Sequence, residues 1–186
     1  TSYTMVMPSG AVSCTYTNTR LSQQLNLAKT WVNGGTGHTV NVATTGGTAN
    51  ASLASTAPGP TTGSAVTVYA GDVVTLPAET FGGGASAGQY TVAVACTGGS
   101  PLTSGATGRS LTIPGSATAT TCTYTNTRVS SAVSLAKTWV NGKAGDAVSL
   151  SIAGGSGATA GSATVGGAAA AATGTAVVGG PGTPDR

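Results

Sequence analysis

The feature that most constrains this chain is an internal repeat with a period of 108 positions. The stretch CTYTNTRLSQQLNLAKTWVNGG begins at Cys14, and the stretch CTYTNTRVSSAVSLAKTWVNGK begins at Cys122. Self-similarity at a fixed period indicates a repeat architecture. A period of this length holds a whole domain rather than one turn of a solenoid, so we expect compact units joined by very short linkers.

The repeat divides the 186 residues into three parts. Residues 21–128 form one complete repeat, residues 1–20 are the C-terminal strand of a preceding repeat, and residues 129–186 are the N-terminal part of a following repeat. We therefore expect the chain to be a piece of a longer tandem array. Residues 153–180 are rich in Ala, Gly and Thr and also read as a flexible linker, but GTAVVGG falls where the complete repeat has the strand-like AVTVYA.

Composition favours short strands over amphipathic helices. Only 6% of the residues are charged, whereas an ordinary soluble domain carries about a quarter, and Val-rich runs alternate with glycine turn signals. Seven strands are predicted in the complete repeat, in LNLAKTWV, HTVNVA, AVTVYA, DVVTLPAETF, GQYTVAVACT, RSLTIP and TTCTYTNTR. Residues 44–64 and 82–88 are expected to be loops. The prediction is an all-β protein, an Ig-like antiparallel β-sandwich repeated every 108 residues.

Several classes of function are disfavoured. The net charge of +3 comes from seven scattered Lys and Arg residues, so no basic patch for nucleic acid or anionic lipid is expected. The sequence contains no apolar run long enough to cross a membrane and no signal-peptide pattern at its start. It shows no metal-ligand spacing and no phosphate-binding loop, and we expect no cofactor. The single histidine, His38, reads as an exposed strand residue rather than a catalytic base. An enzyme acting on an external substrate is not expected.

Strand parity makes Lys29 unusual. In LNLAKTWV it shares a face with Leu25, Leu27 and Trp31, the face that must turn inward if the sandwich has a core. Lys137 occupies the same position in the later copy. Burial of an unpaired ammonium is costly and lowers the lysine pKa, and a neutral amine is a nucleophile.

The last strand offers a complementary group. In CTYTNTR the side chains of Cys122, Tyr124 and Asn126 share one face. A buried Asn carboxamide beside a neutral amine can be attacked at its carbonyl carbon, which releases ammonia and leaves an amide cross-link. That reaction needs a buried carboxylic acid as proton shuttle. The complete repeat contains two acids: Asp72 lies in a turn dipeptide, where a solvated Asp is expected, so Glu79 is the better candidate.

These features resemble a known family. A lysine in KTW on the first strand, a glutamate in the middle of the domain and an asparagine in YTNTR on the last strand are similar to the Cna-B-type, prealbumin-like (SpaA-like) domains of bacterial pilins and surface adhesins. The resemblance implies a prealbumin-like sandwich with a self-formed isopeptide bond between Lys29 and Asn126 and with Glu79 as the autocatalytic acid and base. Lys137 and Asn18 would be the equivalents in neighbouring repeats.

A plainer interpretation of the same residues stays open. Lys29 could be a half-buried edge residue whose stem packs on Trp31 while its amine reaches water. Asn126 could be a strand-end residue that is hydrogen-bonded to a turn.

The cysteines follow the same offset. Cys96 ends one predicted strand and Cys122 opens the last one, so we predict a disulfide between them, with a lone buried thiol as the alternative. Cys14, the counterpart of Cys122, would then pair with a residue upstream of this sequence. Disulfide use points to an oxidising compartment.

The expected function is structural: a repeat of a long bacterial fibre or adhesin that is secreted or exposed on the cell surface and is stabilised by an isopeptide and a disulfide. The expected partners are neighbouring repeats and other copies of the chain. Two alternatives remain. Outward Thr123, Thr125 and Thr127 suit an adhesive module for carbohydrate, ice or a host surface, and the end segments suit a filament subunit that assembles by strand exchange.

Overall fold

The computed structural model of the chain describes residues 3–98, 101–105, 108–115, 119–133, 136–151, 160–164, 172–173 and 177–179. The described part is all-β, apart from the single short 3-10 turn Ala87–Gln89. The first sheet has the order β4, β1, β11 and β8, with β5 also paired to β1. Its strands are β1 (Ser22–Val32), β4 (Thr61–Thr62), β5 (Val66–Tyr69), β8 (Tyr90–Thr97) and β11 (Thr120–Arg128).

A second layer is built from two three-stranded sheets, with the orders β3, β2, β7 and β6, β10, β9. They consist of β2 (Thr39–Ala43), β3 (Ser52–Thr56), β6 (Val73–Leu76), β7 (Thr80–Gly82), β9 (Thr103–Gly105) and β10 (Gly108–Thr112). An isolated bridge between Thr45 and Thr75 joins the two sheets. All pairings in this layer are antiparallel.

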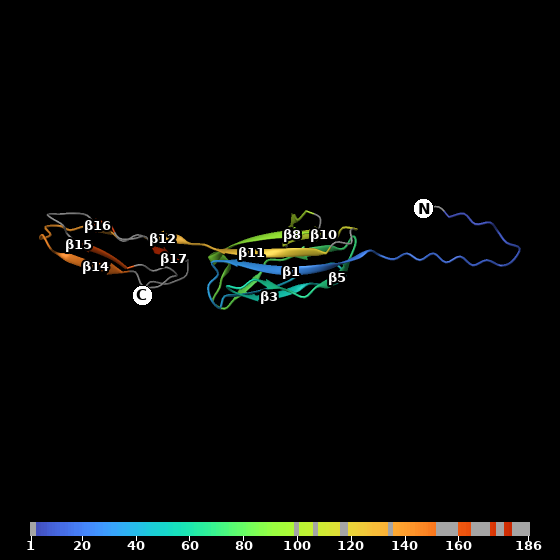
Figure 1. Cartoon of the computed structure of the whole chain (residues 1–186), viewed down its shortest axis with the longest axis horizontal. Helices are drawn as coiled ribbons and strands as arrows, with labels where there is room; N and C mark the ends of the chain where they lie inside the picture. The colour runs from blue at the N-terminus through green and yellow to red at the C-terminus, as the bar shows by residue number, and fades with distance from the viewer. Residues whose placement is uncertain are drawn as a thin grey trace.

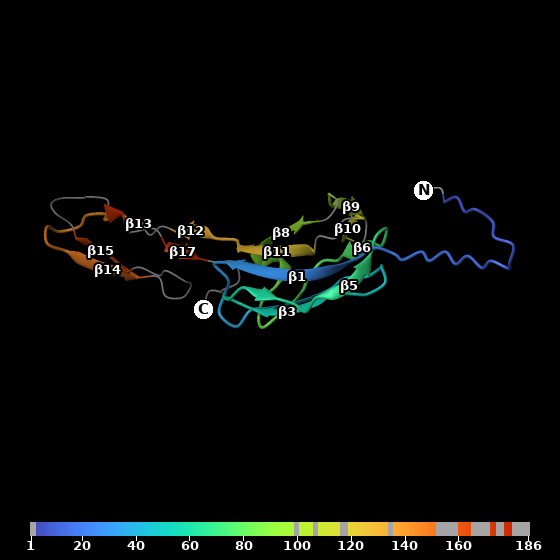
Figure 2. The same cartoon turned by 45° about the vertical axis from the view of Figure 1, so that its right-hand side comes forward.

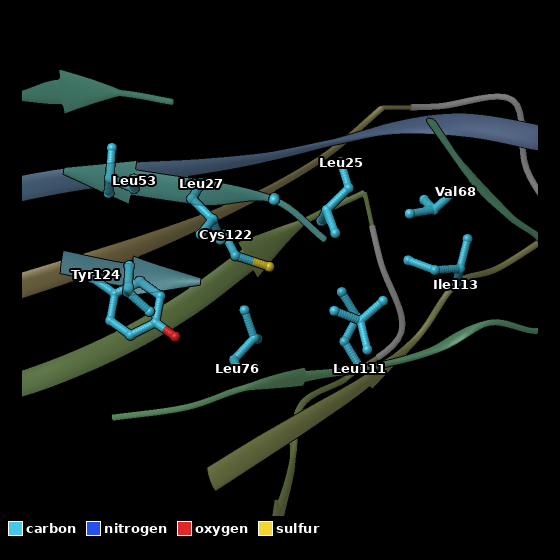
Figure 3. Close-up of a cluster of buried hydrophobic side chains, with 12 residues drawn as sticks. Leu25, Leu27, Leu53, Val68, Leu76, Leu111, Ile113, Cys122 and Tyr124 are labelled. Atoms are coloured by element: carbon cyan, nitrogen blue, oxygen red, sulfur yellow. The ribbon is translucent and has the colours of Figure 1, made fainter. Parts of the chain in front are cut away.

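The two layers enclose two clusters of buried hydrophobic side chains, of which Figure 3 shows the larger. Alternate residues of β1 and β11 enter it from the first sheet, because side chains of a strand point to opposite faces in turn. Leu53, Leu76 and Leu111 enter it from the second layer. This arrangement is consistent with a β-sandwich.

The first and last strands of the complete repeat, β1 and β11, lie side by side and run parallel. A parallel pair places the start of one strand beside the start of the other. The chain therefore enters the sandwich at one end and leaves it at the opposite end, as Figures 1 and 2 show.

The entry point is held by Arg20. Its guanidinium donates to the Asp72 carboxylate at 2.8 Å and lies 4.8 Å from the ring centroid of Tyr69. Asp72 also accepts backbone hydrogen bonds from Tyr69 and Thr48, at 3.0 Å each. These hydrogen bonds hold the pKa of Asp72 well below its usual range, and the bond from the Tyr69 backbone contributes most. The solvated turn Asp expected from the sequence is thus wrong: the carboxylate is 9% exposed and links three segments.

The described strands after residue 128 reproduce local geometry of the complete repeat. They are β12 (Ser131–Val133), β13 (Ala136–Lys137), β14 (Ala147–Ser151), β15 (Ala160–Thr164), β16 (Ala172–Thr173) and β17 (Val177–Gly179). The β14–β15 register is the β2–β3 register moved by 108 positions. Asn33 and Asn141, which are also 108 positions apart, both adopt a positive φ, 55° and 54°. The repeat in the sequence is therefore also a repeat in backbone geometry at these places.

Three segments differ from their expected local structure. Residues 44–64 are not a loop throughout, because they contain β3 and β4. The strand SLAST pairs with β2 and buries Leu53. These tertiary contacts stabilise a strand although the Gly- and Thr-rich residues around it favour a loop. Residues 82–88 include the end of β7 and the start of the 3-10 turn. The segment before residue 21, expected to be a closing strand, forms no strand in the part that the structure describes.

The predicted disulfide between Cys96 and Cys122 is present. The two residues are directly opposite one another in the antiparallel β8–β11 ladder. Cys14 is an exposed free thiol.

Removal of this disulfide is expected to destabilise the fold. Replacing Cys96 and Cys122 together by Ala should lower the free energy of unfolding by about 3 kcal/mol, because the disulfide closes a loop with a sequence separation of 26. Urea unfolding of the full chain measures the change. Cys14→Ala is the matched control and should leave the urea midpoint unchanged; equal midpoints for all three proteins would contradict the prediction.

Candidate cross-link site

Lys29 lies on the buried face of β1. The burial of this strand alternates over most of its length, so that Leu25, Leu27, Lys29 and Trp31 all face the interior. The ammonium nitrogen lies 4.7 Å from the ring centroid of Trp31. The Trp31 indole is itself fixed, because Nε1 donates to Ser55 Oγ at 3.1 Å. The plainer interpretation of Lys29 as an edge residue whose amine reaches water is wrong, since its side chain is 0% exposed.

Glu79 is the acid that meets this lysine. Its Oε1 lies 2.9 Å from Lys29 Nζ, and both side chains are 0% exposed. By distance the contact is an ion pair, but its angles are not those of a hydrogen bond. Because the two atoms are so close, transfer of one proton from Lys29 to Glu79 converts the charged pair into a neutral amine and a neutral acid.

Glu79 reaches the interior because the strand pairing shifts by one residue beside it. Asn41 pairs with Thr80, but Thr45 pairs with Thr75, so one extra residue is inserted on the side of β6 and β7. An extra residue of this kind changes which side chains point inward. Val74 and Leu76 face the core before the insertion, and Glu79 faces it afterwards.

Asn126 lies on the neighbouring strand. The parallel register places Tyr124 opposite Lys29 and Asn126 opposite Trp31. Lys29 and Asn126 are thus diagonal neighbours on the same buried face, a separation that a long side chain can span. Asn126 is 0% exposed, and neither its Oδ1 nor its Nδ2 has a hydrogen-bond partner. A strand-end Asn bonded to a turn, the plainer interpretation, is therefore wrong.

Tyr124 helps to hold the segment that carries Glu79. Its hydroxyl donates to the carbonyl oxygen of Pro77 at 2.9 Å, which ties the segment between Thr75 and Thr80 to β11. Burial raises the pKa of this phenol, and the nearby Glu79 charge raises it further, so Tyr124 remains a neutral donor. This role of Tyr124 is not among the expectations from the sequence, although its position two residues before Asn126, on the same strand face, is a usable signal.

Electrostatics favour a reactive amine. Burial lowers the pKa of Lys29 below its usual value, and the neighbouring Glu79 opposes this shift only in part. An amine with a lowered pKa spends more time neutral, which is the nucleophilic form. The site thus combines a buried nucleophile, an acid in contact with it and a buried carboxamide without partners.

A cleft of about 430 Å³ adjoins the site. It is lined by Glu79, Tyr124 and Arg109 together with apolar side chains that include Phe81 and Val92. The cleft therefore borders the residue that carries the buried acid.

The equivalent residues in the flanking segments are not brought together. Asn18 is exposed on the N-terminal segment, while Lys137 is half-buried, 4.9 Å from the ring centroid of Trp139. Figures 1 and 2 show these segments at opposite ends of the sandwich.

The structure also corrects the interpretation of His38. It precedes β2 rather than lying on an exposed strand, and it is half-buried. Its Nδ1 lies 2.7 Å from the Tyr90 hydroxyl, which accepts a further hydrogen bond from the backbone of Gly35. His38 therefore belongs to the packing at one end of the sandwich.

Comparison of the chain with known protein families, curated proteins and solved structures finds no match. In the described residues no His, Cys, Asp and Glu side chains gather in a group that could hold a metal ion. The described residues also include no helix of the length and apolar character needed to cross a membrane.

The lowered pKa of Lys29 predicts a pH dependence of stability in protein that carries no cross-link. In Asn126→Ala, the unfolded chain binds a proton at Lys29 more readily than the folded chain does, so stability should rise as the pH increases from 7 towards 9.5, below the usual Lys pKa of about 10.4. Urea midpoints across this range measure the effect. The double variant Lys29→Met with Asn126→Ala should lose the rise; a midpoint that falls with pH in Asn126→Ala alone would contradict the assignment.

Proposed function

We propose that residues 21–128 form a self-cross-linking structural repeat of an extracellular bacterial fibre or surface protein. The observation that carries the proposal is the buried trio of Lys29, Glu79 and Asn126. The acid lies 2.9 Å from the amine, and the carboxamide lies diagonally across the parallel strands without a hydrogen-bond partner. Buried polar groups without partners are rare in folded proteins and call for an explanation. Conversion of the trio into an amide supplies one.

The reaction follows from the positions of these groups. A proton passes from the Lys29 ammonium to Glu79, and the neutral amine then attacks Cγ of Asn126. The protonated acid polarises the Asn126 carbonyl and carries a proton from the attacking nitrogen to the leaving nitrogen. The Cγ–Nδ2 bond breaks, ammonia departs, and a Lys–Asn amide remains. The proton that Glu79 took from the Lys29 ammonium leaves with the ammonia as ammonium, which returns Glu79 to its carboxylate. Both reacting side chains belong to the domain, so it acts only on itself and not on an external substrate.

The direction of the strands supports a mechanical role for the proposed bond. Because β1 and β11 are parallel, the chain enters and leaves at opposite ends of the sandwich. A pull along the chain would pass from Lys29 directly to Asn126 and would bypass every strand between them. A disulfide between β8 and β11 suits an oxidising, extracellular setting. A repeat with these properties suits a load-bearing stalk whose partners are neighbouring repeats.

Intact mass tests the cross-link. The full chain, denatured and measured by mass spectrometry, should be lighter than the mass calculated from its sequence by one ammonia, in addition to the two hydrogens lost to the disulfide. Lys29→Met and Asn126→Ala should each show no ammonia loss. Glu79→Gln should leave the bond unformed or slow its formation by at least about a hundredfold, since it removes the proton shuttle.

Lys137→Met is the matched control, because it alters the equivalent lysine outside the complete repeat and should keep the ammonia loss. A full chain at its calculated mass, folded and with Lys29 intact, would overturn the proposal.

Pulling tests the mechanical role. Under force from its two ends, the sandwich of residues 21–128 should show no lengthening step, because the load does not reach residues 30–125. Asn126→Ala should unfold with a step that is shortened by the disulfide loop between Cys96 and Cys122. Reductant should lengthen the step of Asn126→Ala and leave the wild-type trace unchanged. A wild-type sandwich that extends like Asn126→Ala would contradict the load path.

A further inference from the structure

Strand β8 (Tyr90–Thr97) forms an open edge of the first sheet. It pairs with β11 on one side, and on its other side the described residues place no strand. On the far side of the same sheet, β4 is covered by β3 of the second layer, where Thr61 Oγ1 lies 2.8 Å from Ser55 Oγ. β8 is thus a full-length strand with one side that lacks a partner among the described residues.

The backbone groups that β8 turns to this open side follow from its pairing with β11. Opposite residues of an antiparallel pair lie about 5.5 Å apart at Cα where they exchange hydrogen bonds and about 4.5 Å apart where they do not. Cys96 and Cys122 are opposite one another and 4.0 Å apart at Cα, so they do not exchange backbone hydrogen bonds. Gln89, on the alternate set of positions, accepts instead from the backbone of Val129, beside the end of β11. The N–H and C=O groups that point away from β11 are therefore those of Tyr90, Val92, Val94 and Cys96.

The sequence of this strand does not protect the edge. Natural edge strands commonly carry charged residues, especially Lys, or a Pro or a bulge, which prevent pairing with another chain. YTVAVACT contains no charged residue and no Pro, and it pairs with β11 without an inserted residue. Val92 is 37% exposed although it lies on the inner face, opposite Asn126. The edge therefore combines backbone groups that can bind a further strand with uncovered apolar surface.

We propose that β8 of one copy of this chain pairs with β8 of a second copy, antiparallel and around a two-fold axis at Ala93. A second copy fits this edge, because a two-fold axis perpendicular to the sheet sets the same donors and acceptors against one another. The rotation also keeps inner face beside inner face, so that Val92 of each copy lies opposite Val94 of the other. Because β8 carries no charge, the contact brings no like charges together within the strand.

The position of the axis follows from the limits of the strand. With the axis at Ala93, the pairing runs from Tyr90 to Cys96 in each copy and lies wholly within β8. An axis two positions later would extend the pairing to Gly98, whose φ of 75° is not that of a strand. An axis at Val94 would set Val92 against Cys96, whose sulfur is already bonded to Cys122. The axis at Ala93 gives both exposed valines an apolar partner.

Antiparallel pairing fixes the relative direction of the two copies. The first and last strands run between the two ends of the sandwich, as Figures 1 and 2 show, and β8 lies antiparallel to the last strand. Paired sandwiches therefore lie side by side and point in opposite directions. If the chain is a repeat of a surface fibre, on which this step rests, fibres of one surface point the same way. The contact then joins fibres that project from facing surfaces.

The repeat compensates for the size of the contact. A single pair of strand edges is small beside the roughly 1,200–2,000 Å² that a stable protein interface buries. Successive repeats of an array add their contacts, because the first contact raises the effective concentration of the next. The pairing itself does not need the Lys29–Asn126 bond.

Disulfide trapping of the full chain tests the pairing. In a Cys14→Ser background, which removes the exposed native thiol, Ala93→Cys should form disulfide-linked dimers at least about tenfold faster than Ala95→Cys at the same protein concentration. Ala95 is the matched control, because it is exposed on the same face of the same strand but lies opposite Thr91 of the other copy. Equal rates for the two variants would overturn the proposal.

A mixture of two variants tests the direction and the register. Thr91→Cys and Ala95→Cys, in the same background, should each dimerise slowly alone. Mixed in equal amounts, they should form the heterodimer at least about tenfold faster than either homodimer, because the antiparallel register sets the two positions opposite one another. A mixture without preference for the heterodimer would overturn antiparallel pairing at Ala93.

The same samples keep this proposal separate from the proposed function. After reduction, the intact mass of each variant reports the ammonia loss that accompanies the Lys29–Asn126 bond. Ammonia loss without trapping would overturn the pairing alone, whereas trapping without ammonia loss would support the pairing and overturn the cross-link.

Discussion

The structure depends on the parallel pairing of its first and last strands. Eight register positions join β1 and β11, and β11 is flanked on its other edge by β8. Parallel neighbours cannot be joined by a tight turn, so the whole of residues 33–119 serves as their connection. This pairing brings Lys29 and Asn126 onto the same buried face although they are 97 positions apart. It also sends the two ends of the sandwich in opposite directions, which is what a row of repeats requires.

The site also depends on an irregularity in the second layer, where one extra residue lies between β6 and β7. A regular strand through residues 73–82 that buries Val74 and Leu76 would turn Glu79 outward, because strand faces alternate with a period of two. The extra residue between Thr75 and Thr80 changes that parity and buries the Glu79 carboxylate. Pro77 suits the site because it has no backbone N–H to leave unpaired, and its carbonyl accepts the Tyr124 hydroxyl. The last strand therefore both carries the carboxamide and holds the acid.

Much of this arrangement could be predicted from alternation and the repeat. Alternation in LNLAKTWV and CTYTNTR is enough to place Lys29 and Asn126 on inward faces, and the all-β class and the Cys96–Cys122 disulfide also follow from the sequence. The rest depends on contacts between distant segments. β3 forms in a Thr- and Gly-rich stretch because β2 pairs with it, and the Asp72 carboxylate is bound by Arg20 and by the backbone of Thr48. Glu79 follows from the sequence only by elimination, because Asp72 lies in a turn dipeptide and strand period alone points Glu79 outward.

The disulfide and the buried trio are linked by register. A slip of one residue between β11 and its neighbours would turn Asn126 to the outer face and Thr125 to the core. The disulfide fixes Cys122 opposite Cys96, four residues before Asn126 on the same strand. It therefore excludes the slipped pairing at the position where an error would separate the carboxamide from the amine. The buried trio lowers the stability of the fold, because buried polar groups without partners are costly. The disulfide holds the last strand in register and offsets part of that cost.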